Sequence, residues 1–217
     1  MTTPLYRRLL QPETLAALDA LHAENARHGE TTPDDDLDVL AGLIVAARAY
    51  QILQLGTFLG GSALVLADLA RQNNPEQAKV LTVDPDPAMN AACHKYAQLA
   101  GLESVIETVD GFSTDPRLLA QFRGTEWQAI YLDTTHQYGQ TVDEIQCLAP
   151  LCGPATLFLF HDASVHAANA LDLGGRGGVR QAMREYCLMN PRWQTFTFEA
   201  PAFGKFGIGL MQKRVAA

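Results

Sequence analysis

Ile52-Leu53-Gln54-Leu55-Gly56-Thr57-Phe58-Leu59-Gly60-Gly61-Ser62 is an apolar run that leads into a glycine-rich turn. This order predicts a buried strand, a tight turn and a helix that begins near Ser62. Glycine lets the backbone approach a ligand closely, and the free N–H groups of a helix start favour a carboxylate. The spacing is G-x-x-x-G, so the G-x-G-x-x-G pattern of dinucleotide binders is absent. The turn is a candidate cofactor loop, although a plain strand–helix packing turn would carry the same glycines.

Short apolar runs alternate with longer helical patterns after this loop. Strands are expected near residues 51–56, 79–84, 104–109, 128–133 and 155–161, and helices near 61–71, 87–100, 115–123, 139–149 and 175–188. Two further apolar runs, Trp193–Phe198 and Phe206–Met211, are joined through Gly204-Lys205 without a helix, so they must pair antiparallel. The pattern predicts an α/β fold: a seven-stranded, mostly parallel sheet with a C-terminal antiparallel hairpin and helices on both faces.

The first 49 residues carry helical patterns. Thr32-Pro33-Asp34-Asp35 predicts a helix start, with Thr32 as the cap and Pro33 at the first helical position. At 217 residues the chain is long enough for one substantial core. We therefore interpret residues 1–217 as a single domain, with residues 1–49 as an N-terminal helical cap segment and residues 50–213 as the core.

The composition argues against several classes of partner. The chain has 24 acidic and 16 basic residues, a net charge of -8, and lacks the clustered Lys and Arg of a nucleic-acid surface. Its apolar runs are shorter than the roughly 20 residues of a membrane span, and no apolar segment follows Arg7 and Arg8 as in an export signal. The four cysteines form no CxxC pair. We expect reduced thiols, a cytoplasmic location, and neither nucleic acid nor membrane as a partner.

A carboxylate ends the strand that follows the glycine loop. In Leu81-Thr82-Val83-Asp84-Pro85-Asp86, Asp84 lies about one strand–helix–strand unit after the loop. A carboxylate at this edge can accept hydrogen bonds from both hydroxyls of a ribose. The alternative is that Asp84 and Asp86 only cap the next helix.

Acids and histidines also end the fourth and fifth expected strands. Asp133 and His136 lie three residues apart just past the fourth strand, and His161-Asp162 ends the fifth. Such a carboxylate could ligate a metal, and the imidazole could remove a proton. His166 could reach the same cleft from a loop, and we expect residues 163–180 to form a lid because of their glycines. The alternative is that the acids and histidines only hydrogen-bond loops at the sheet edge.

These segments, together with Asp110-Gly111-Phe112-Ser113, resemble class I S-adenosylmethionine (SAM)-dependent O-methyltransferases of the catechol and caffeoyl-CoA type. They also resemble bacterial small-molecule methyltransferases with an apolar-Asp-x-x-His-x-Tyr segment and a His-Asp strand end. The similarity runs from about Thr32 to Lys213. It implies a Rossmann-like class I methyltransferase fold, SAM as the cofactor and methyl transfer to a hydroxyl oxygen of a small molecule. A homodimer is a candidate assembly.

The resemblance also implies roles for single residues. Gly56 and Ser62 would hold the methionine moiety of SAM, Asp84 its ribose, and Ser113 would border the adenine. The full set of implied cofactor-binding residues is Gln54, Gly56, Thr57, Phe58, Gly60, Ser62, Asp84, Ser113 and Asp133. The family usually has glutamate where this chain has Gln54, which puts a buried charge contact in doubt, although an amide can still hydrogen-bond the loop.

In the resembling enzymes the acid at Asp133 binds a metal and the residue at His136 is a base. The implied metal ligands are Asp133, His161 and Asp162, and the implied catalytic residues are Asp133 and His136. A mixed oxygen and nitrogen set suits Mg²⁺ less exclusively than oxygen alone, so Mn²⁺ and Fe²⁺ are alternatives. An alignment shifted by one residue would remove His161 from the metal.

Two other functions remain open at this point. One is a metal-dependent, hydroxylase-like relative that performs oxidation, similar to the cephalosporin hydroxylases. The other is a SAM-binding protein without catalysis. A nicotinamide dehydrogenase is disfavoured because the spacing of Gly56 and Gly60 offers a pyrophosphate poorer access to N–H groups.

Overall fold

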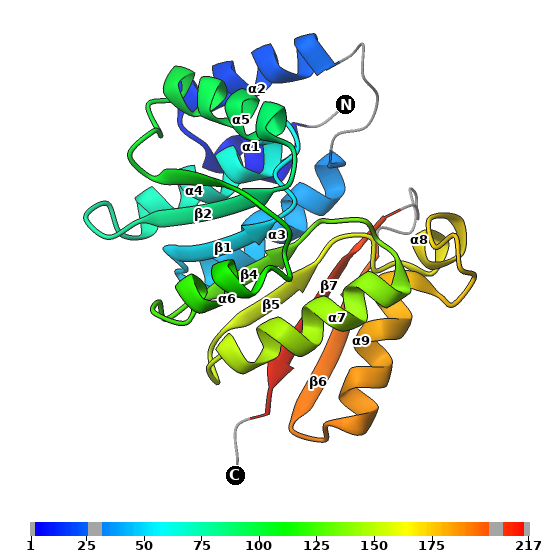
Figure 1. The fold of residues 1–217 in the computed structure, drawn as a ribbon. Coiled ribbons are helices and arrows are strands. Elements are labelled where there is room, and N and C mark those ends of the chain that lie inside the picture. The colour runs from blue at the N-terminus through cyan, green and yellow to red at the C-terminus, as the bar shows by residue number, and fades with distance from the viewer. Residues whose placement is uncertain (1–2, 26–31, 200–205, 215–217) are drawn as a thin grey trace. The chain divides into compact units, whose positions relative to one another are not determined.

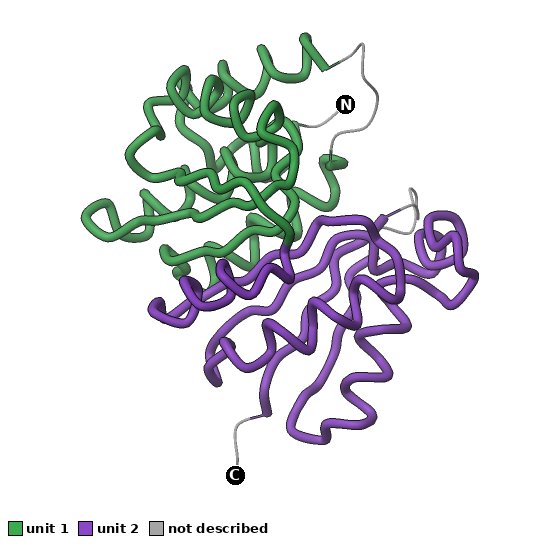
Figure 2. Tube along the Cα trace, in the orientation of Figure 1, with its two compact units in different colours: residues 1–112 green, residues 113–217 purple. Residues whose placement is uncertain are grey.

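The computed structural model describes residues 3–25, 32–199 and 206–214, and the chain divides into two compact units (Figures 1 and 2). Unit 1 comprises residues 1–112 and unit 2 residues 113–217. The interpretation of residues 1–217 as one domain stays a prediction.

Unit 1 contains three helices followed by alternating strands and helices. Its elements are α1 (Leu5–Leu9), α2 (Pro12–Asn25), α3 (Asp34–Ala47), β1 (Gln51–Leu55), α4 (Gly61–Asn73), β2 (Lys79–Asp84), α5 (Pro87–Leu99) and β3 (Ile106–Asp110). The strands run parallel in the order β3-β2-β1, with Leu53 beside Leu81 and Leu81 beside Glu107. Four consecutive β1 residues from Ile52 are buried, as expected for a strand covered on both faces.

Unit 2 combines a parallel pair with an antiparallel hairpin. Its elements are α6 (Pro116–Phe122), β4 (Ala129–Leu132), α7 (Tyr138–Leu148), the 3₁₀ turn η1 (Ala149–Leu151), β5 (Leu157–Phe160), α8 (Val165–Ala170), α9 (Gly178–Met189), β6 (Trp193–Phe198) and β7 (Ile208–Lys213). The strand order is β4-β5-β7-β6. β4 and β5 are parallel, whereas β7 is antiparallel to both β5 and β6. α7 and α9 pack against each other beside these strands (Figure 1).

All seven expected strands are present, and the Rossmann-like α/β class with its C-terminal antiparallel hairpin is confirmed. Thr32 is not the cap of α3: Pro33 occupies that position, because its ψ of 150° is extended and the helix begins at Asp34. The last strand begins at Ile208, two residues later than expected. The Gly204-Lys205 turn lies outside the described residues.

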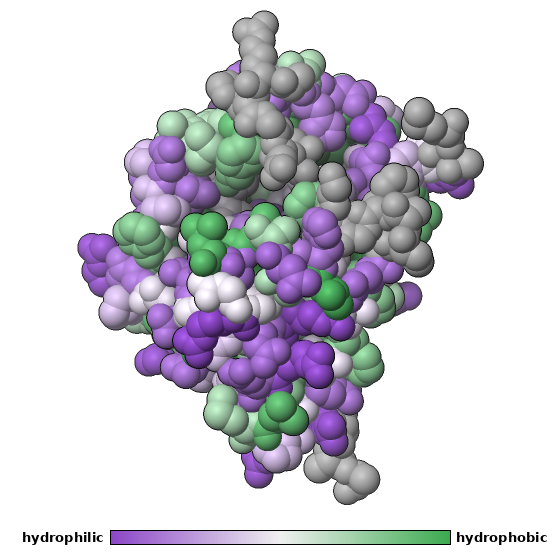
Figure 3. Space-filling model, turned by 90° about the vertical axis from the view of Figure 1, so that its right-hand side faces the viewer, coloured by the Kyte–Doolittle hydropathy of each residue, from purple (hydrophilic) through white to green (hydrophobic). Residues whose placement is uncertain are grey.

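The helix expected from residue 175 begins at Gly178, and a short helix, α8, was not expected at all. The Ser164 hydroxyl starts α8 by accepting a hydrogen bond from the Ala167 N–H, which is a typical N-cap. None of the described helices has both the length and the apolar character needed to cross a membrane. Figure 3 shows hydrophobic residues in separate groups among hydrophilic ones on one face of the molecule.

Candidate functional site

The glycine loop of unit 1 connects β1 to α4 and depends on left-handed backbone at two positions. Gly56 and Gly60 have φ angles of 90° and 91°. A Cβ atom at Gly60 would lie 2.6 Å from the Cys93 Sγ on α5, so only glycine fits there. No side chain caps the first turn of α4. The backbone N–H groups at the start of α4 are therefore not capped by a side chain, and they lie next to the end of β1.

Asp84, at the end of β2, holds this loop in place. Its Oδ2 accepts hydrogen bonds from the backbone N–H groups of Thr57 and Phe58, both at 3.0 Å, and its Oδ1 accepts one from Asp86 N–H at 3.0 Å. Of the two acids that could cap the next helix, Asp86 does so: its Oδ1 accepts a hydrogen bond from Ala88 N–H at the start of α5. A carboxylate has about four acceptor sites, so Asp84 retains capacity for another donor.

Gln54 lies beneath the loop and is completely buried. Its Nε2 donates to the Gly56 carbonyl at 2.9 Å and to the Ser62 hydroxyl at 3.0 Å, so the amide does hydrogen-bond the loop. Its Oε1 has no hydrogen-bond partner among the described residues. A buried acceptor left unpaired costs free energy, and a ligand N–H group would satisfy it.

Ser113, the first residue of unit 2, belongs to a buried network around Glu144. The Ser113 hydroxyl donates to Glu144 Oε1 at 2.5 Å, and the Thr134 hydroxyl donates to Oε2 at 3.0 Å. Burial raises the pKa of Glu144 despite the hydrogen bonds from Ser113, Gln140 and Thr134. Sequence reasoning missed Glu144, although an acid on the face of α7 that also carries Thr141 and Ile145 was a signal.

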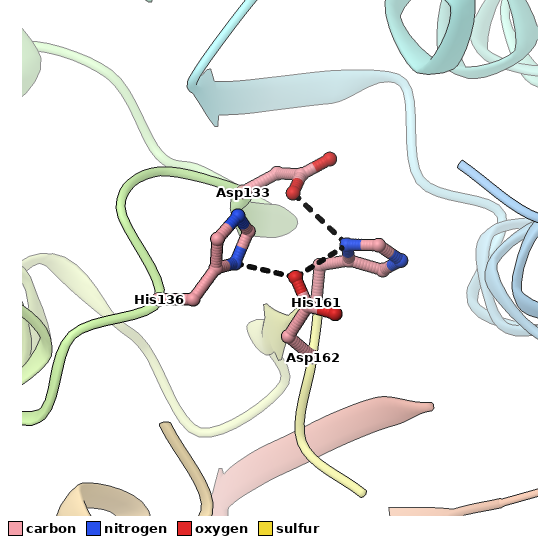
Figure 4. A group of neighbouring side chains, drawn as sticks. All are labelled: Asp133, His136, His161 and Asp162. Atoms are coloured by element: carbon pink, nitrogen blue, oxygen red, sulfur yellow. Dashed lines mark ion pairs between the residues drawn. The ribbon is translucent and has the colours of Figure 1, made fainter. Parts of the chain in front are cut away.

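Four of the predicted residues come together at the ends of β4 and β5 (Figure 4). Leu132 and Phe160 are neighbours in this parallel pair, so the residues that follow them emerge at one edge. His136 Nδ1 lies 2.5 Å from Asp162 Oδ2, and His161 Nδ1 lies 3.0 Å from Asp133 Oδ1 and 3.1 Å from Asp162 Oδ2. One potential ligand atom from each residue lies within 4.8 Å of the others. We call these four residues the acid–histidine cluster.

The backbone of the cluster is strained. His136 and Asp162 have φ angles of 58° and 56°, in the left-handed region that residues other than glycine rarely adopt. Among the described residues, only Arg48 and Phe58 share this feature without being glycine. Strain of about 1–3 kcal/mol per residue is typical of functional sites, and three of the four strained positions are predicted site residues.

The charges of the cluster are strongly coupled. Burial by itself would raise the pKa of Asp162, but hydrogen bonds from His136 and His161 lower it well below its usual range. Burial likewise opposes the rise in the pKa of His136, which the hydrogen bond and charge of Asp162 nevertheless produce. The Asp162 carboxylate is 3% exposed, and its Oδ1 has no partner among the described residues. An unpaired buried carboxylate oxygen among two imidazoles and a second carboxylate fits a divalent cation.

Other predicted features lie apart from the cluster. His166 is exposed on α8 and does not belong to the cluster. Residues 163–180, expected to form a lid, contain Asp172. Its carboxylate accepts hydrogen bonds from the backbone N–H groups of Tyr138, Arg176 and Gly178. Asp172 is a second residue that the sequence did not predict, because an acid in a glycine-rich loop cannot be distinguished by sequence from a solvent-exposed one. Whether this segment moves over a substrate stays a prediction.

The chain matches a family model described as a methyltransferase domain over residues 53–163, about half its length. That range contains the glycine loop, Asp84, Ser113 and the acid–histidine cluster. A search of curated proteins finds no match.

Several solved structures share the fold. The O-methyltransferase from Bacillus cereus in complex with SAH is 17% identical, with a TM-score of 0.73 and coverage of 94% of this chain and 91% of that one. A putative caffeoyl-CoA O-methyltransferase from Staphylococcus aureus is 14% identical, with a TM-score of 0.74 and coverage of 97% and 96%. The O-methyltransferase TomG from Streptomyces achromogenes, in complex with SAM, is 17% identical, with a TM-score of 0.72 and coverage of 94% and 91%. At these identities the likeness is one of fold.

Proposed function

Because the chain belongs to the family of methyltransferase domains, we propose that it transfers a methyl group from SAM to a hydroxyl oxygen of a small molecule, assisted by a divalent metal and by His136. The observation that carries this proposal is the acid–histidine cluster at the ends of β4 and β5. The SAH and SAM named for two structures of the same fold support the choice of methyl donor.

The loop of unit 1 supplies groups suited to SAM. The unpaired Oε1 of Gln54 would accept a hydrogen bond from the ammonium group of the methionine moiety. Asp84 would use its remaining acceptor capacity for a ribose hydroxyl, while Thr57 and Phe58 keep it in place through their N–H groups. The uncapped start of α4 favours the methionine carboxylate. Ser113 is expected to border the adenine.

The cluster in unit 2 supplies groups suited to the acceptor. Asp133, His161 and Asp162 would hold the metal, which when bound lowers the pKa of a nearby hydroxyl. Asp162 holds the Nδ1 of His136, which leaves the Nε2 of that imidazole to take a proton. Against the effect of burial, Asp162 raises the pKa of His136 and so favours the protonated imidazole. His136 can act as a base only in its neutral form, with the proton kept on Nδ1 and Nε2 free.

The reaction is a single displacement at carbon. The acceptor oxygen forms a bond to the methyl carbon as the carbon–sulfur bond of SAM breaks, and the hydroxyl proton passes to His136. The products are a methyl ether and S-adenosylhomocysteine (SAH), and no covalent enzyme intermediate is needed. Most of the acceleration comes from holding oxygen and methyl group in line. The rigid ends of β4 and β5 support such positioning because their backbone is bonded in register.

Methyl transfer is tested by measuring SAH formation with a panel of catechols and other hydroxylated aromatic compounds in anaerobic buffer. We expect turnover to disappear on exhaustive chelation and to return with Mg²⁺, Mn²⁺ or Fe²⁺. His136→Gln should lower turnover by about 10²-fold or more, while SAH affinity stays unchanged. His166→Gln, on exposed α8, is the matched control and should retain full activity.

A different result would refute each part of the proposal. Full activity in the chelated enzyme would remove the metal, and a fully active His136→Gln would remove the base. Turnover that needs oxygen and yields no SAH would support the hydroxylase-like alternative, and SAM binding without turnover of any acceptor would support the noncatalytic one.

We also propose a small hydroxylated molecule as the partner, with neither nucleic acid nor membrane involved, and a cytoplasmic location. The net charge of -8 supports the exclusion of nucleic acid. A homodimer is tested by sedimentation of the purified chain.

A further inference from the structure

A groove in unit 2 lies between the second half of α9 and the edge strand β6. It is open to solvent and has a volume of about 450 Å³, and its walls include Arg184, Cys187, Leu188, Trp193, Phe196 and Arg214. We call it the α9–β6 groove. Its volume falls within the range of small-molecule sites, about 300–1,000 Å³.

Strand register separates this groove from the acid–histidine cluster. Phe160, next to the cluster, pairs with Gly209 of β7, whereas Trp193 pairs with Lys213, four residues further along β7. At about 3.3 Å per residue, Trp193 lies roughly 13 Å further along the strand than Phe160. Phe196, at the other end of the groove, pairs with Leu210, one residue from Gly209, but it lies across β7 from β5. The groove therefore lies across β7 from the cluster, and the two share no residue.

The groove carries two arginines, and no acidic side chain is among the described residues that line it. Neither Arg184 nor Arg214 forms an ion pair within the described parts of the chain. Burial raises the pKa of the Cys187 thiol, and the nearby charge of Arg214 opposes that rise. Other arginines do pair with acids; Arg7 contacts Asp19, for instance. Two unpaired guanidinium groups in one groove of a chain with net charge -8 favour an anionic ligand.

The rest of the groove is apolar and contains one unsatisfied hydroxyl. Leu188 of α9 and Phe196 of β6 are 80% and 47% exposed, whereas Trp193, also on β6, is largely buried. The Thr195 hydroxyl, also in the groove wall, is buried and has no hydrogen-bond partner in the described chain. Such a surface suits a ligand with an apolar body as well as an anionic group.

We propose that the α9–β6 groove binds a small organic anion, a carboxylate or phosphate monoester with a hydrocarbon or aromatic body. Arg184 and Arg214 bind the anionic group, and Leu188, Trp193 and Phe196 contact the apolar body. The proposal is independent of methyl transfer, because none of these residues belongs to the loop or to the cluster.

Trp193 provides a reporter inside the groove. The chain has two tryptophans, and Trp127 is buried elsewhere in unit 2 with its Nε1–H bonded to the Phe122 carbonyl. In a Trp127→Phe background, Trp193 fluorescence is titrated with octanoate, with 1-octanol as the neutral match and with inorganic phosphate as an anion that lacks an apolar body. Arg184→Gln/Arg214→Gln is the test variant, and Arg123→Gln, on the exposed surface after α6, is the control.

Octanoate should change the fluorescence saturably, with about tenfold or greater weakening for octanol, for phosphate and for the double variant. The Arg123→Gln control should bind octanoate normally. Equal binding of octanol, or octanoate binding that survives loss of both arginines, would overturn the proposal. So would dimerisation of the free chain that the double variant abolishes, because the groove would then be an interface between copies. If Trp127→Phe fails to fold, calorimetric titration of the native chain answers the same question.

Discussion

Replacing Asp84 with asparagine keeps the shape of the side chain but removes its charge and one of its two acceptor oxygens. An amide oxygen in the place of Oδ2 can still accept from Thr57 and Phe58, but its NH₂ group then faces Asp86 N–H, donor against donor. One charge-assisted hydrogen bond is lost and two others become neutral. Hydrogen bonds to charged groups contribute about 1.5–3 kcal/mol and neutral ones about 0.5–1.5 kcal/mol.

Added together these values give about 3.5–6 kcal/mol. Because the bonds to Phe58 and Asp86 are exposed to solvent, we expect Asp84→Asn to lower the free energy of unfolding by a smaller amount, about 2–4 kcal/mol, without any ligand. SAM and SAH should bind roughly 10- to 100-fold more weakly, because the ribose loses a charged acceptor. Asp86→Ala is the matched control. It removes the cap of α5, at a cost of about 1 kcal/mol, but leaves the glycine loop untouched.

The two effects are measured separately. Urea unfolding of the ligand-free variants gives the stability change, and calorimetric titration with SAH gives the affinity change at a temperature where each variant is folded. Wild-type SAH affinity in Asp84→Asn would refute the cofactor assignment. Wild-type stability would instead refute the account of how Asp84 holds the loop.

Three further predictions concern stability, each measured by urea unfolding. Gly60→Ala should cost about 2 kcal/mol or more, because alanine at φ 91° is strained and its Cβ would overlap Cys93; an unchanged midpoint would contradict this. Phe158→Ala should cost about 3–5 kcal/mol, since Phe158 is completely buried; a loss below 1 kcal/mol would show that the core refills around it. The pKa of His136 is raised in the folded chain, so the stability that it contributes is fully present below the unfolded pKa of about 6.5 and is lost as pH rises through the folded value. In chelator, the native chain should lose stability as the pH rises above about 6.5, and His136→Gln should show a smaller loss; equal slopes would exclude the pairing with Asp162.

Sequence periodicity predicted the strands because each is a short buried run bounded by turn residues. The rule that parallel strands end at one edge then placed Asp133 and His161 near each other, and the structure brings them together with His136 and Asp162. These predictions needed only local pattern and strand direction.

What sequence could not predict depends on contacts between distant residues. Glu144 belongs to a network only because α7 packs beneath the residues that follow β4. Asp172 fixes its loop through N–H groups that come from two separate helix starts. α8 is only six residues long, too short for periodicity to distinguish it from a loop.

The left-handed backbone at His136 and Asp162 has a consequence for how variants of this chain would evolve. Glycine or asparagine would relieve the conformational cost at either position, so a library screened for thermal tolerance alone should be enriched in these residues there. The same library screened for turnover should instead retain histidine and aspartate. Opposite enrichment at these two positions would show that the native residues there lower stability and are retained because they are needed for activity.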